Sequence, residues 1–324
     1  MPGLFVKYMN SLRTGSSWVA SSLTRYPHVW GMPPVISLEL TNHCNLRCPE
    51  CATGSGLLKR EKGFMDPALY DRVISEMKPF LFYLNLYFQG EPMAHPDFFR
   101  FTGPVEGISK VVSTNGHFLS VANAEKLAGS GIGKLIVSLD GMDSRTYSLY
   151  RKDGDYEKVL QGIRNMAESI RMTRSSLILE IQFLVNRHNE DQIGKAHDFA
   201  REVNARLRLK SMQIISGDDA YDWMPLNRRY RRYTADGRSF RIKSKLPDRC
   251  FRLWMNPVIT WDGKVIPCCF DKDAESVMGD LNTESFRTIW NGERFKDFRR
   301  RVLNDRKSIA ICGNCTSGLR GVRY

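Results

Sequence analysis

The feature that most constrains the fold of this chain is a regular alternation of short β-rich runs with longer helical stretches from Pro34 onward. Strands are predicted at residues 35–41, 82–91, 111–115, 134–140, 177–185 and 207–215. Helices are predicted between them at residues 66–78, 96–107, 121–131, 156–172 and 190–204. Strands that alternate with helices form a parallel sheet with right-handed crossovers. The fold is therefore either an open doubly wound sheet or a complete or partial barrel.

The polar residues of these strands favour the barrel. Alternate residues of a strand share a face, and most strands carry polar side chains on one face toward their carboxyl ends. These sets are Glu39 and Thr41; Tyr83, Asn85, Tyr87, Gln89 and Glu91; Ser113 and Asn115; Ser138 and Asp140; Glu180 and Gln182. Strands covered on both faces would be continuously apolar. We therefore predict an α/β fold, a partial (β/α)6 barrel with a small C-terminal cysteine-rich α+β module, whose polar inner face holds a ligand.

This register places Glu39 and Glu180 inside the barrel. A carboxylate there needs a partner or an altered pKa, so at least one of the two is expected to contact a cofactor or substrate. If both pointed to solvent, the predicted register would be wrong by one residue.

The eight cysteines fall into two groups, three within residues 44–51 and five within residues 250–315. No secretory signal opens the chain. We therefore expect a reducing, cytoplasmic location, where clustered cysteines usually bind metal or perform redox chemistry rather than form disulfides.

The first group, Cys44, Cys48 and Cys51, has the spacing C-x3-C-x2-C directly after the first predicted strand. Three thiolates on a short loop can hold three irons of a 4Fe–4S cubane and leave the fourth iron open to a small molecule. The alternative is a structural zinc site. Zinc would need a fourth ligand, and His43 is too close to Cys44 in the sequence to serve comfortably.

This motif, after the first strand of a six-fold β/α pattern, resembles the radical S-adenosylmethionine enzymes over residues 34–216. The resemblance implies that the open iron chelates the amino and carboxylate groups of S-adenosylmethionine. Reductive cleavage of this cofactor would give a 5′-deoxyadenosyl radical, which takes a hydrogen atom from the substrate.

Further residues match the same family. The segment around Gly90 and Glu91 resembles its Gly-Gly-Glu motif, which meets the methionine amino group, but Gln89 replaces the first glycine, so close backbone approach depends on Gly90. Glu50 departs from the pattern, because the residue before the third cysteine is usually aromatic and contacts the adenine side.

The resemblance extends to the ends of the third and fourth predicted strands. Asn115 and Ser138 lie in segments that resemble the loops flanking the ribose and the methionine carboxylate. Arg151 resembles the arginine that pairs with that carboxylate, a bidentate task that suits a guanidinium.

The second group comprises Cys250, Cys268, Cys269, Cys312 and Cys315. It resembles the short form of the SPASM module, which holds an auxiliary 4Fe–4S cluster; a zinc ribbon is the alternative. The expected ligands are Cys250, Cys268, Cys312 and Cys315. Cys268 and Cys269 compete for one place, since neighbours on an extended strand point to opposite faces.

The spacing from Gly263 favours Cys268 as that ligand. A hairpin is predicted from residues 256–260 and 264–266, followed by a helix near residues 284–302. We expect three parts in all: a lead-in with a short amphipathic helix at 1–33, a radical S-adenosylmethionine core at 34–235 and the SPASM-like module at 245–324. The lead-in would pack on the body or touch an anionic surface.

The net charge of +13 favours anionic partners. The arginines of the run 228–232, in a polar connector at 216–249, would bind an anionic substrate, dock an acidic reductant such as flavodoxin or ferredoxin, or form a solvated loop. No nucleic-acid binding is expected, because no paired aromatic platform or known motif is present. No apolar run reaches the about 18 residues of a membrane span.

We therefore predict a radical S-adenosylmethionine oxidoreductase that abstracts hydrogen from an unidentified peptide, protein side chain or small metabolite, with the auxiliary cluster as electron acceptor. One alternative is a redox-neutral epimerase or decarboxylase acting on a sugar or nucleoside. Another is a non-enzymatic iron–sulfur electron-transfer protein. No general base is identified, and Asp218 and Asp219 are candidates by position alone.

Overall fold

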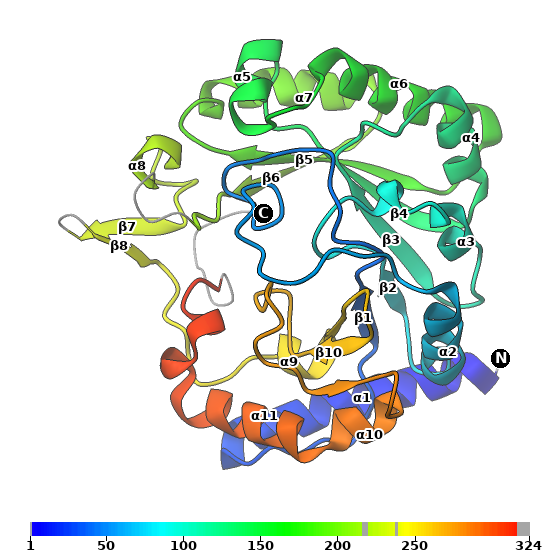
Figure 1. Cartoon of the computed structure of the whole chain (residues 1–324), viewed down its shortest axis with the longest axis vertical. Helices are drawn as coiled ribbons and strands as arrows, with labels where there is room; N and C mark the ends of the chain where they lie inside the picture. Colours follow the sequence, from blue (N-terminus) through cyan, green and yellow to red (C-terminus); the bar gives the residue numbers. More distant parts are fainter. Residues whose placement is uncertain (1, 216–219, 237–238, 316–324) are drawn as a thin grey trace.

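A computed structural model describes residues 2–215, 220–236 and 239–315 of the chain (Figure 1). Its centre is a sheet with the strand order β11-β10-β9-β1-β2-β3-β4-β5-β6. The strands of the core are β1 (Val35–Leu38), β2 (Tyr83–Asn85), β3 (Ser109–Thr114), β4 (Ile132–Ser138), β5 (Ile178–Val185) and β6 (Arg206–Ser211). All six run parallel in chain order. Since β6 is an edge strand, the barrel is partial, as the sequence predicts.

Helices follow the strands and cover the outer face of the sheet (Figure 1). They are α2 (Pro67–Met77), α3 (Phe98–Thr102), α4 (Val121–Gly129), α5 (Ser144–Tyr150), α6 (Tyr156–Thr173) and α7 (Ile193–Glu202). Asp66, Ser120 and Asp155 each accept a backbone N–H at the start of a helix, which satisfies a donor that has no partner within the helix. Helix α5 was not predicted; it begins at the cap residue Asp143.

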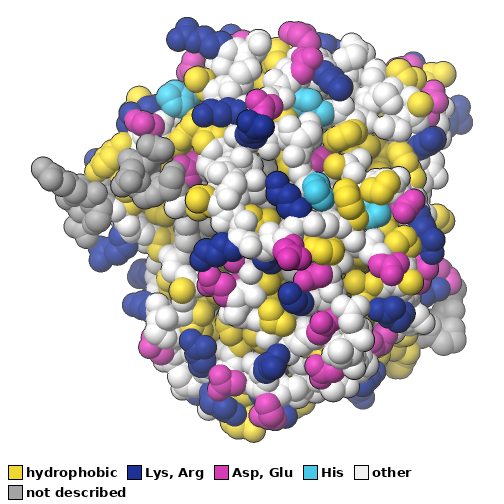
Figure 2. Space-filling model, viewed as in Figure 1, with side chains coloured by type: hydrophobic (Ala, Val, Ile, Leu, Met, Phe, Trp, Pro, Cys, Tyr) yellow, Lys and Arg dark blue, Asp and Glu magenta, His cyan; other side chains and the backbone are white. Residues whose placement is uncertain are grey.

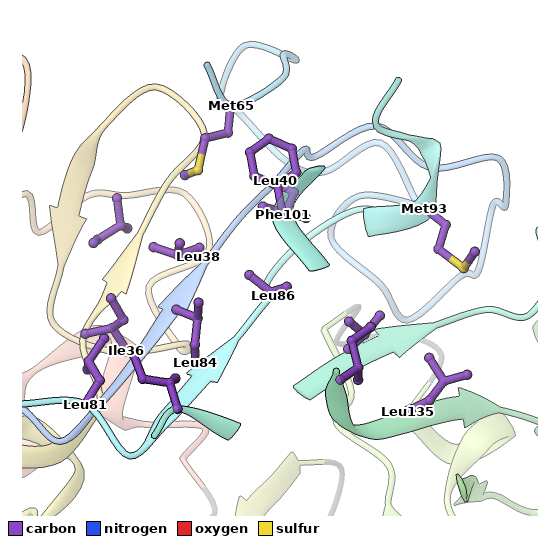
Figure 3. Close-up of a cluster of buried hydrophobic side chains, with 14 of the residues drawn as sticks. Ile36, Leu38, Leu40, Met65, Leu81, Leu84, Leu86, Met93, Phe101 and Leu135 are labelled. Atoms are coloured by element: carbon purple, nitrogen blue, oxygen red, sulfur yellow. The ribbon is translucent and has the colours of Figure 1, made fainter. Parts of the chain in front are cut away.

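The core lies between the outer face of the sheet and these helices. Apolar side chains of β1, β2 and β4 meet others from the surrounding segments, as Figure 3 shows for Ile36, Leu38, Leu84, Leu86 and Leu135. Each fully buried side chain of this size contributes about 1.5–3 kcal/mol. The alternation of these residues with the polar ones of the inner face confirms the predicted strand register.

Several predicted elements are shorter than expected, among them β1, β6 and α7, and the difference is largest for β2 and α3. Strand β2 ends at Asn85 rather than at residue 91, because Gly90 has a positive φ of 75° and the chain then turns into the 3-10 helix η1 (Pro92–Ala94). Helix α3 ends at Thr102 rather than near residue 107. Gly103 precedes Pro104, and the residue before a proline avoids the helical region.

The C-terminal module extends the core sheet. Strand β9 (Val258–Ile259) pairs parallel with β1. Strand β10 (Lys264–Ile266) pairs antiparallel with β9, and β11 (Gly279–Asp280) pairs antiparallel with β10. Sequence reasoning predicted the hairpin but not its union with the core. The predicted helix at 284–302 is two helices, α10 (Phe286–Asn291) and α11 (Glu293–Asp305), because Gly292 between them has an extended ψ of 163°.

The lead-in is dominated by α1 (Pro2–Thr24), which is longer than predicted. The prediction that it packs on the body is confirmed, but the packed face is polar: Asn10 and Thr14 bond the carbonyl of Met32 at 2.9 Å each. Apolar residues such as Phe5 (68% exposed) and Leu23 (79% exposed) face outward. Packing of the lead-in on the C-terminal module is secured by α9 (Arg252–Met255), whose Trp254 indole donates to the His28 carbonyl.

The connector contains more structure than predicted. Helix α8 (Ala220–Trp223) precedes an antiparallel hairpin of β7 (Tyr233–Asp236) and β8 (Ser239–Ile242), so the predicted core boundary at residue 235 falls inside a hairpin. Asp218 and Asp219 lie outside the described residues. On the face seen in Figure 2, basic and acidic side chains are interspersed. No helix in the described ranges is long and apolar enough to cross a membrane.

Candidate functional site

Cys44, Cys48 and Cys51 lie on the loop that follows β1, over the carboxyl ends of the core strands. Their thiols pack in a small apolar cluster with Leu46, Tyr150, Met212, Leu184 and Trp223. Burial raises the pKa of Cys44 to about 11 and also raises the pKa of Cys48. Without a cation nearby, burial therefore keeps the thiols of Cys44 and Cys48 protonated, and a metal centre would favour their thiolate forms.

Nitrogen donors point at two of these sulfurs. The Leu46 amide lies 3.4 Å from the Cys44 sulfur and the Asn115 side-chain amide 3.9 Å from it. An Arg151 nitrogen lies 3.7 Å from the Cys48 sulfur. Such contacts are the means by which proteins adjust iron–sulfur clusters. The donor set, three free thiols with N–H groups around them, fits a cubane held by three thiolates.

A cubane differs from a single-ion site because each thiolate binds a different iron. No group of three His, Cys, Asp or Glu side chains in the described ranges is arranged to hold one metal ion.

At Gly90 the chain that follows β2 packs closely against Thr41 and Asn42, the residues that precede the cysteine loop. A Cβ atom there would lie 2.6 Å from the Thr41 carbonyl oxygen and 2.7 Å from Asn42 backbone atoms. The next amide, that of Glu91, donates to the His43 carbonyl at 2.7 Å. The close backbone approach expected at Gly90 is thus present, and both the approach and the positive φ require glycine.

The Glu91 carboxylate is buried and fully surrounded by donors. It accepts hydrogen bonds from the Thr114 hydroxyl at 2.7 Å, the Asn115 amide at 2.6 Å and the Met93 amide at 3.1 Å. Burial nevertheless raises its pKa to about 7. Glu91 therefore ties the end of β3 to the turn before η1, and its carboxylate would be stabilised further by a nearby cation.

Arg151 lies at the end of α5 and forms a buried ion pair. Its Nε donates to the Asp140 Oδ2 at 2.6 Å, while the other Asp140 oxygen accepts the Leu184 amide at 2.7 Å. Asp140 is completely buried. Sequence reasoning singled out Arg151 but missed Asp140 as its partner; its position at the end of β4, before a glycine, was the available signal. Ser138, two residues earlier, is buried opposite Gln182 of β5.

Glu50 has a structural use that the sequence does not reveal. Its Oε2 accepts the amide of Ile215 at 2.5 Å, which fixes the segment after β6 onto the cysteine loop. The carbonyl of Ile214 accepts the Asn314 side-chain amide at 3.0 Å. Asn314 lies between Cys312 and Cys315, so this short chain of contacts joins the two cysteine groups.

The two interior acids are both buried, which agrees with the predicted register. Glu39 forms a bidentate pair with Arg60 at 2.8 and 2.6 Å and accepts the Trp261 amide at 3.2 Å. It thus joins β1 to the turn between β9 and β10. Glu180 lies 3.2 Å from Lys134 and 3.7 Å from Arg208.

In the C-terminal group, Cys250, Cys268, Cys312 and Cys315 influence one another electrostatically. Burial raises the pKa of Cys268 and that of Cys312, and the charges of Cys250 and Cys315 raise both further. The buried Arg306 lies 3.3 Å from the Cys315 sulfur. The charges of Cys250 and Cys315 thus act on both of the other thiols, and the four stay the predicted ligand set.

Cys269 adjoins Cys268 and also contacts the core. Its charge has the largest electrostatic influence on the Cys268 thiol. Its sulfur accepts an Arg252 nitrogen at 3.0 Å, and its charge acts on Tyr87 and Lys210 of the core. The choice of Cys268 over Cys269 as a ligand therefore stays a prediction. A hollow of about 220 Å³ lies where the two modules meet, lined by Ala52, Gln213 and Lys272 among others. A larger one, about 680 Å³, lies between α6 and α7 and contains none of the site residues.

Comparison with known proteins agrees with this arrangement. Residues 38–203 match the radical SAM superfamily, and residues 250–316 match SPASM, an iron–sulfur cluster-binding domain. The AdoMet-dependent heme synthase of Methanosarcina barkeri is 33% identical over 180 residues, 53% of this chain and 48% of that protein. This chain thus spans about half the length of that relative.

Two relatives align over more of the chain. Mycofactocin maturase MftC of Mycobacterium tuberculosis is 24% identical over 311 residues, 87% of this chain and 75% of that protein. The S-adenosyl-L-methionine-dependent 2-deoxy-scyllo-inosamine dehydrogenase of Niallia circulans is 24% identical over 294 residues, 87% of this chain and 92% of that protein.

Solved structures show the same fold. Streptococcus suis SuiB bound to S-adenosylmethionine superposes with a TM-score of 0.64 at 15% identity, covering 96% of this chain and 78% of that one. BtrN in complex with AdoMet and 2-DOIA gives a TM-score of 0.56 at 20% identity, covering 90% of this chain and 97% of that one.

Proposed function

Because the chain belongs to the radical SAM superfamily and carries a SPASM domain, we propose that it is an oxidoreductase that removes a hydrogen atom from a peptide, protein side chain or small metabolite. The cofactors of such an enzyme are S-adenosylmethionine, the 4Fe–4S cluster that binds it and an auxiliary iron–sulfur cluster. When bound and reduced, the first cluster would supply the electron for reductive cleavage of S-adenosylmethionine to methionine and the 5′-deoxyadenosyl radical.

The observation that carries this proposal is the arrangement around Cys44, Cys48 and Cys51. Three free thiols share an apolar pocket, and N–H donors point at the sulfurs of Cys44 and Cys48. The apolar side chains of Tyr150 and Trp223 would exclude water from this end of the barrel, which protects a reactive radical.

The chain's own residues would bind and orient the methionine end of the cofactor. Glu91, whose burial raises its pKa, favours a nearby ammonium group, and Gly90 allows the backbone to approach closely. Arg151, held in place by Asp140, would meet the carboxylate with its remaining N–H groups. Asn115 and Ser138 lie at adjacent strand ends and would contribute hydrogen bonds.

The auxiliary site supports net oxidation rather than a redox-neutral outcome. If Cys250, Cys268, Cys312 and Cys315 hold one cubane, every iron of it would have a protein ligand. Such a cluster has no place for a substrate and suits electron acceptance. A substrate radical that loses a proton and passes one electron to this centre would be oxidised by two electrons in total.

Radical SAM enzymes need an external reductant, and we propose flavodoxin or ferredoxin for this chain. Arg228 and Arg229 are exposed and would attract an acidic protein. The other arginines of that run have structural contacts: Arg231 donates to the Pro225 carbonyl at 2.6 Å, and Arg232 is buried against Phe270. The eight free thiols support a reducing, cytoplasmic location.

The experiment is an assay for 5′-deoxyadenosine with anaerobically reconstituted protein, reductant and S-adenosylmethionine. The wild type is expected to form the product. The variant with Cys44, Cys48 and Cys51 all replaced by alanine should form none while keeping roughly half of its iron, because the auxiliary site remains. A triple variant that still cleaves S-adenosylmethionine would contradict the assignment.

A further inference from the structure

Strand β6 presents a row of cations to the inside of the barrel. Arg206, Arg208 and Lys210 alternate with Leu207 and Leu209, so the two sets face opposite sides of the sheet. The leucines pack with the apolar cluster around Phe183, Val185 and Ala196. The cations therefore share the inner face with the polar residues of β5.

The register fixes which residues these cations face. Arg206 lies beside Glu180, Arg208 beside Gln182 and Lys210 beside Leu184. On β4, the Lys134 ammonium lies 3.2 Å from the Glu180 carboxylate. Four cations thus share this part of the inner wall with the Glu180 carboxylate, and two of them, Lys134 and Arg208, form an ion pair with it.

Residues from distant parts of the chain close the same space. Tyr87 lies just after β2, and β2 is four strands away from β6 in the sheet. The charges of Arg208 and Glu180 nevertheless affect the pKa of the Tyr87 phenol. Arg252 and Cys269 of the C-terminal module are joined by a hydrogen bond of 3.0 Å. The charges of both affect the pKa of Tyr87 and that of Lys210. The curvature of the sheet therefore brings β2, β6 and the second module around one interior region.

This region lies between the two cysteine groups. The charges of Cys51, in the first group, and of Cys269, in the second, both act on the ammonium group of Lys272. Burial lowers the pKa of Lys272 and also that of Lys210. A substrate placed here would be close to both groups at once.

Within the described residues, Glu180 balances only part of the charge of β6. Within the described ranges, the Lys210 ammonium makes no hydrogen bond or ion pair, and the buried Nε of Arg208 has no hydrogen-bond partner. The arginines near the cysteines do have partners there: Arg151, Arg252 and Arg306 each contact a cysteine sulfur. Arg208 and Lys210 make no such contact.

We propose that Arg208 and Lys210 bind an anionic oxygen group of the substrate, a carboxylate or a phosphate, inside the barrel. This rests on the proposed function, because it assumes that the substrate lies between the two cysteine groups. The guanidinium offers a planar pair of donors and the ammonium a point charge, a combination that suits either anion.

The test is calorimetric titration of the reconstituted enzyme, saturated with S-adenosylmethionine, with inorganic pyrophosphate, with succinate and with the neutral myo-inositol. S-adenosylmethionine is included so that its own carboxylate site is filled. The wild type should bind at least one of the two anions and not myo-inositol. Preference for pyrophosphate or for succinate identifies the source of the anionic group.

Arg208→Gln and Lys210→Gln should each weaken anion binding at least about tenfold, and the double variant should abolish it. Arg206→Gln is the matched control: it removes the same charge from the same face at the exposed end of the strand and should bind like the wild type. Iron content and affinity for S-adenosylmethionine are measured on every variant.

Anion binding by the double variant equal to that of Arg206→Gln would overturn the inference, as would binding of neither anion by the wild type. Failure of the proposed function is a different result, namely no 5′-deoxyadenosine from the wild type in the assay above.

Discussion

The two cysteine groups differ in how their charge is balanced. In the first, the guanidinium near Cys48 belongs to Arg151, which is already neutralised by the buried Asp140. In the second, Arg306 contacts Cys315 and backbone carbonyls, and Arg252 contacts Cys269. Neither of these makes an ion pair with a carboxylate in the part of the chain that the structure describes.

This difference in charge balance agrees with the predicted ligand sets, three thiolates in the first group and four in the second. Two unneutralised arginines offset the larger negative charge of a fully thiolate-bound cluster. The first site instead has an acid, Glu91, and an acid–base pair, Arg151 with Asp140, at the place where a ligand with an ammonium and a carboxylate would lie.

The largest expected effect separates the neighbours Cys268 and Cys269. Cys268→Ala should abolish the auxiliary cluster, because the spacing from Gly263 makes Cys268 the predicted ligand, whereas Cys269→Ala should keep it. Iron analysis and electron paramagnetic resonance, in a background without the radical-site cysteines, measure this. Loss of the signal in Cys269→Ala alone would reverse the assignment, and zinc in place of iron would refute an auxiliary iron–sulfur cluster.

The next effect concerns the first site. Arg151→Ala should weaken S-adenosylmethionine binding at least about tenfold without loss of iron, because a charged contact in a partly buried site is removed. Asp140→Asn should also weaken binding, since the guanidinium loses its buried partner. Equilibrium binding to the reconstituted enzyme measures both. Unchanged affinity in Arg151→Ala would mean that another arginine, such as Arg145, holds the carboxylate.

The affinity for S-adenosylmethionine should also depend on pH through Glu91. Burial raises its pKa from the ordinary 4.5 to about 7, so the folded protein keeps a proton there that the unfolded chain releases. The stability contributed by this group is therefore present below pH 4.5 and lost as the pH rises through about 7. An ammonium ligand needs the ionised form, so affinity should rise across the same range.

Glu91→Gln should remove this pH dependence of binding, and Glu50→Gln, which changes another buried acid near the loop, should retain it. A pH profile of the dissociation constant decides the matter. An unaltered profile in Glu91→Gln would assign the titration to a different group.

A smaller effect is expected on the potential of the auxiliary cluster. Arg306→Gln removes a positive charge 3.3 Å from the Cys315 sulfur and should shift the midpoint potential to more negative values. Arg306→Lys keeps the charge and should shift it less. A redox titration followed by electron paramagnetic resonance measures both; equal shifts would show that hydrogen-bond geometry, not charge, sets the potential.

The smallest effect tests the contacts between the two regions. Asn314→Ala removes the hydrogen bond to the Ile214 carbonyl and the one that Asn314 accepts from the Tyr233 hydroxyl, and the free energy of unfolding should fall by about 1–2 kcal/mol. Denaturant unfolding of the reconstituted protein measures it, with the exposed Asn291→Ala on α10 as a control of similar size. An equal loss in both variants would mean that the contact does not stabilise the junction.

The sequence by itself determined the alternation of strands and helices, the side of each strand that faces inward and the spacing of the cysteines. These are local properties: side chains alternate along a strand, and a short loop brings its own thiols together. The requirement for glycine at Gly90 was also visible, because the neighbouring motif implied close backbone approach, and the observed φ of 75° agrees.

Only the tertiary structure decided the rest, because it depends on contacts between residues far apart in the chain. The pairing of β9 with β1, the ion pair of Asp140 with Arg151 and the use of Glu50 to hold Ile215 all join distant segments. Helix α1 is the clearest case. Its pattern predicted an amphipathic helix, but which face is buried depends on the polar carbonyls that the body presents to Asn10 and Thr14.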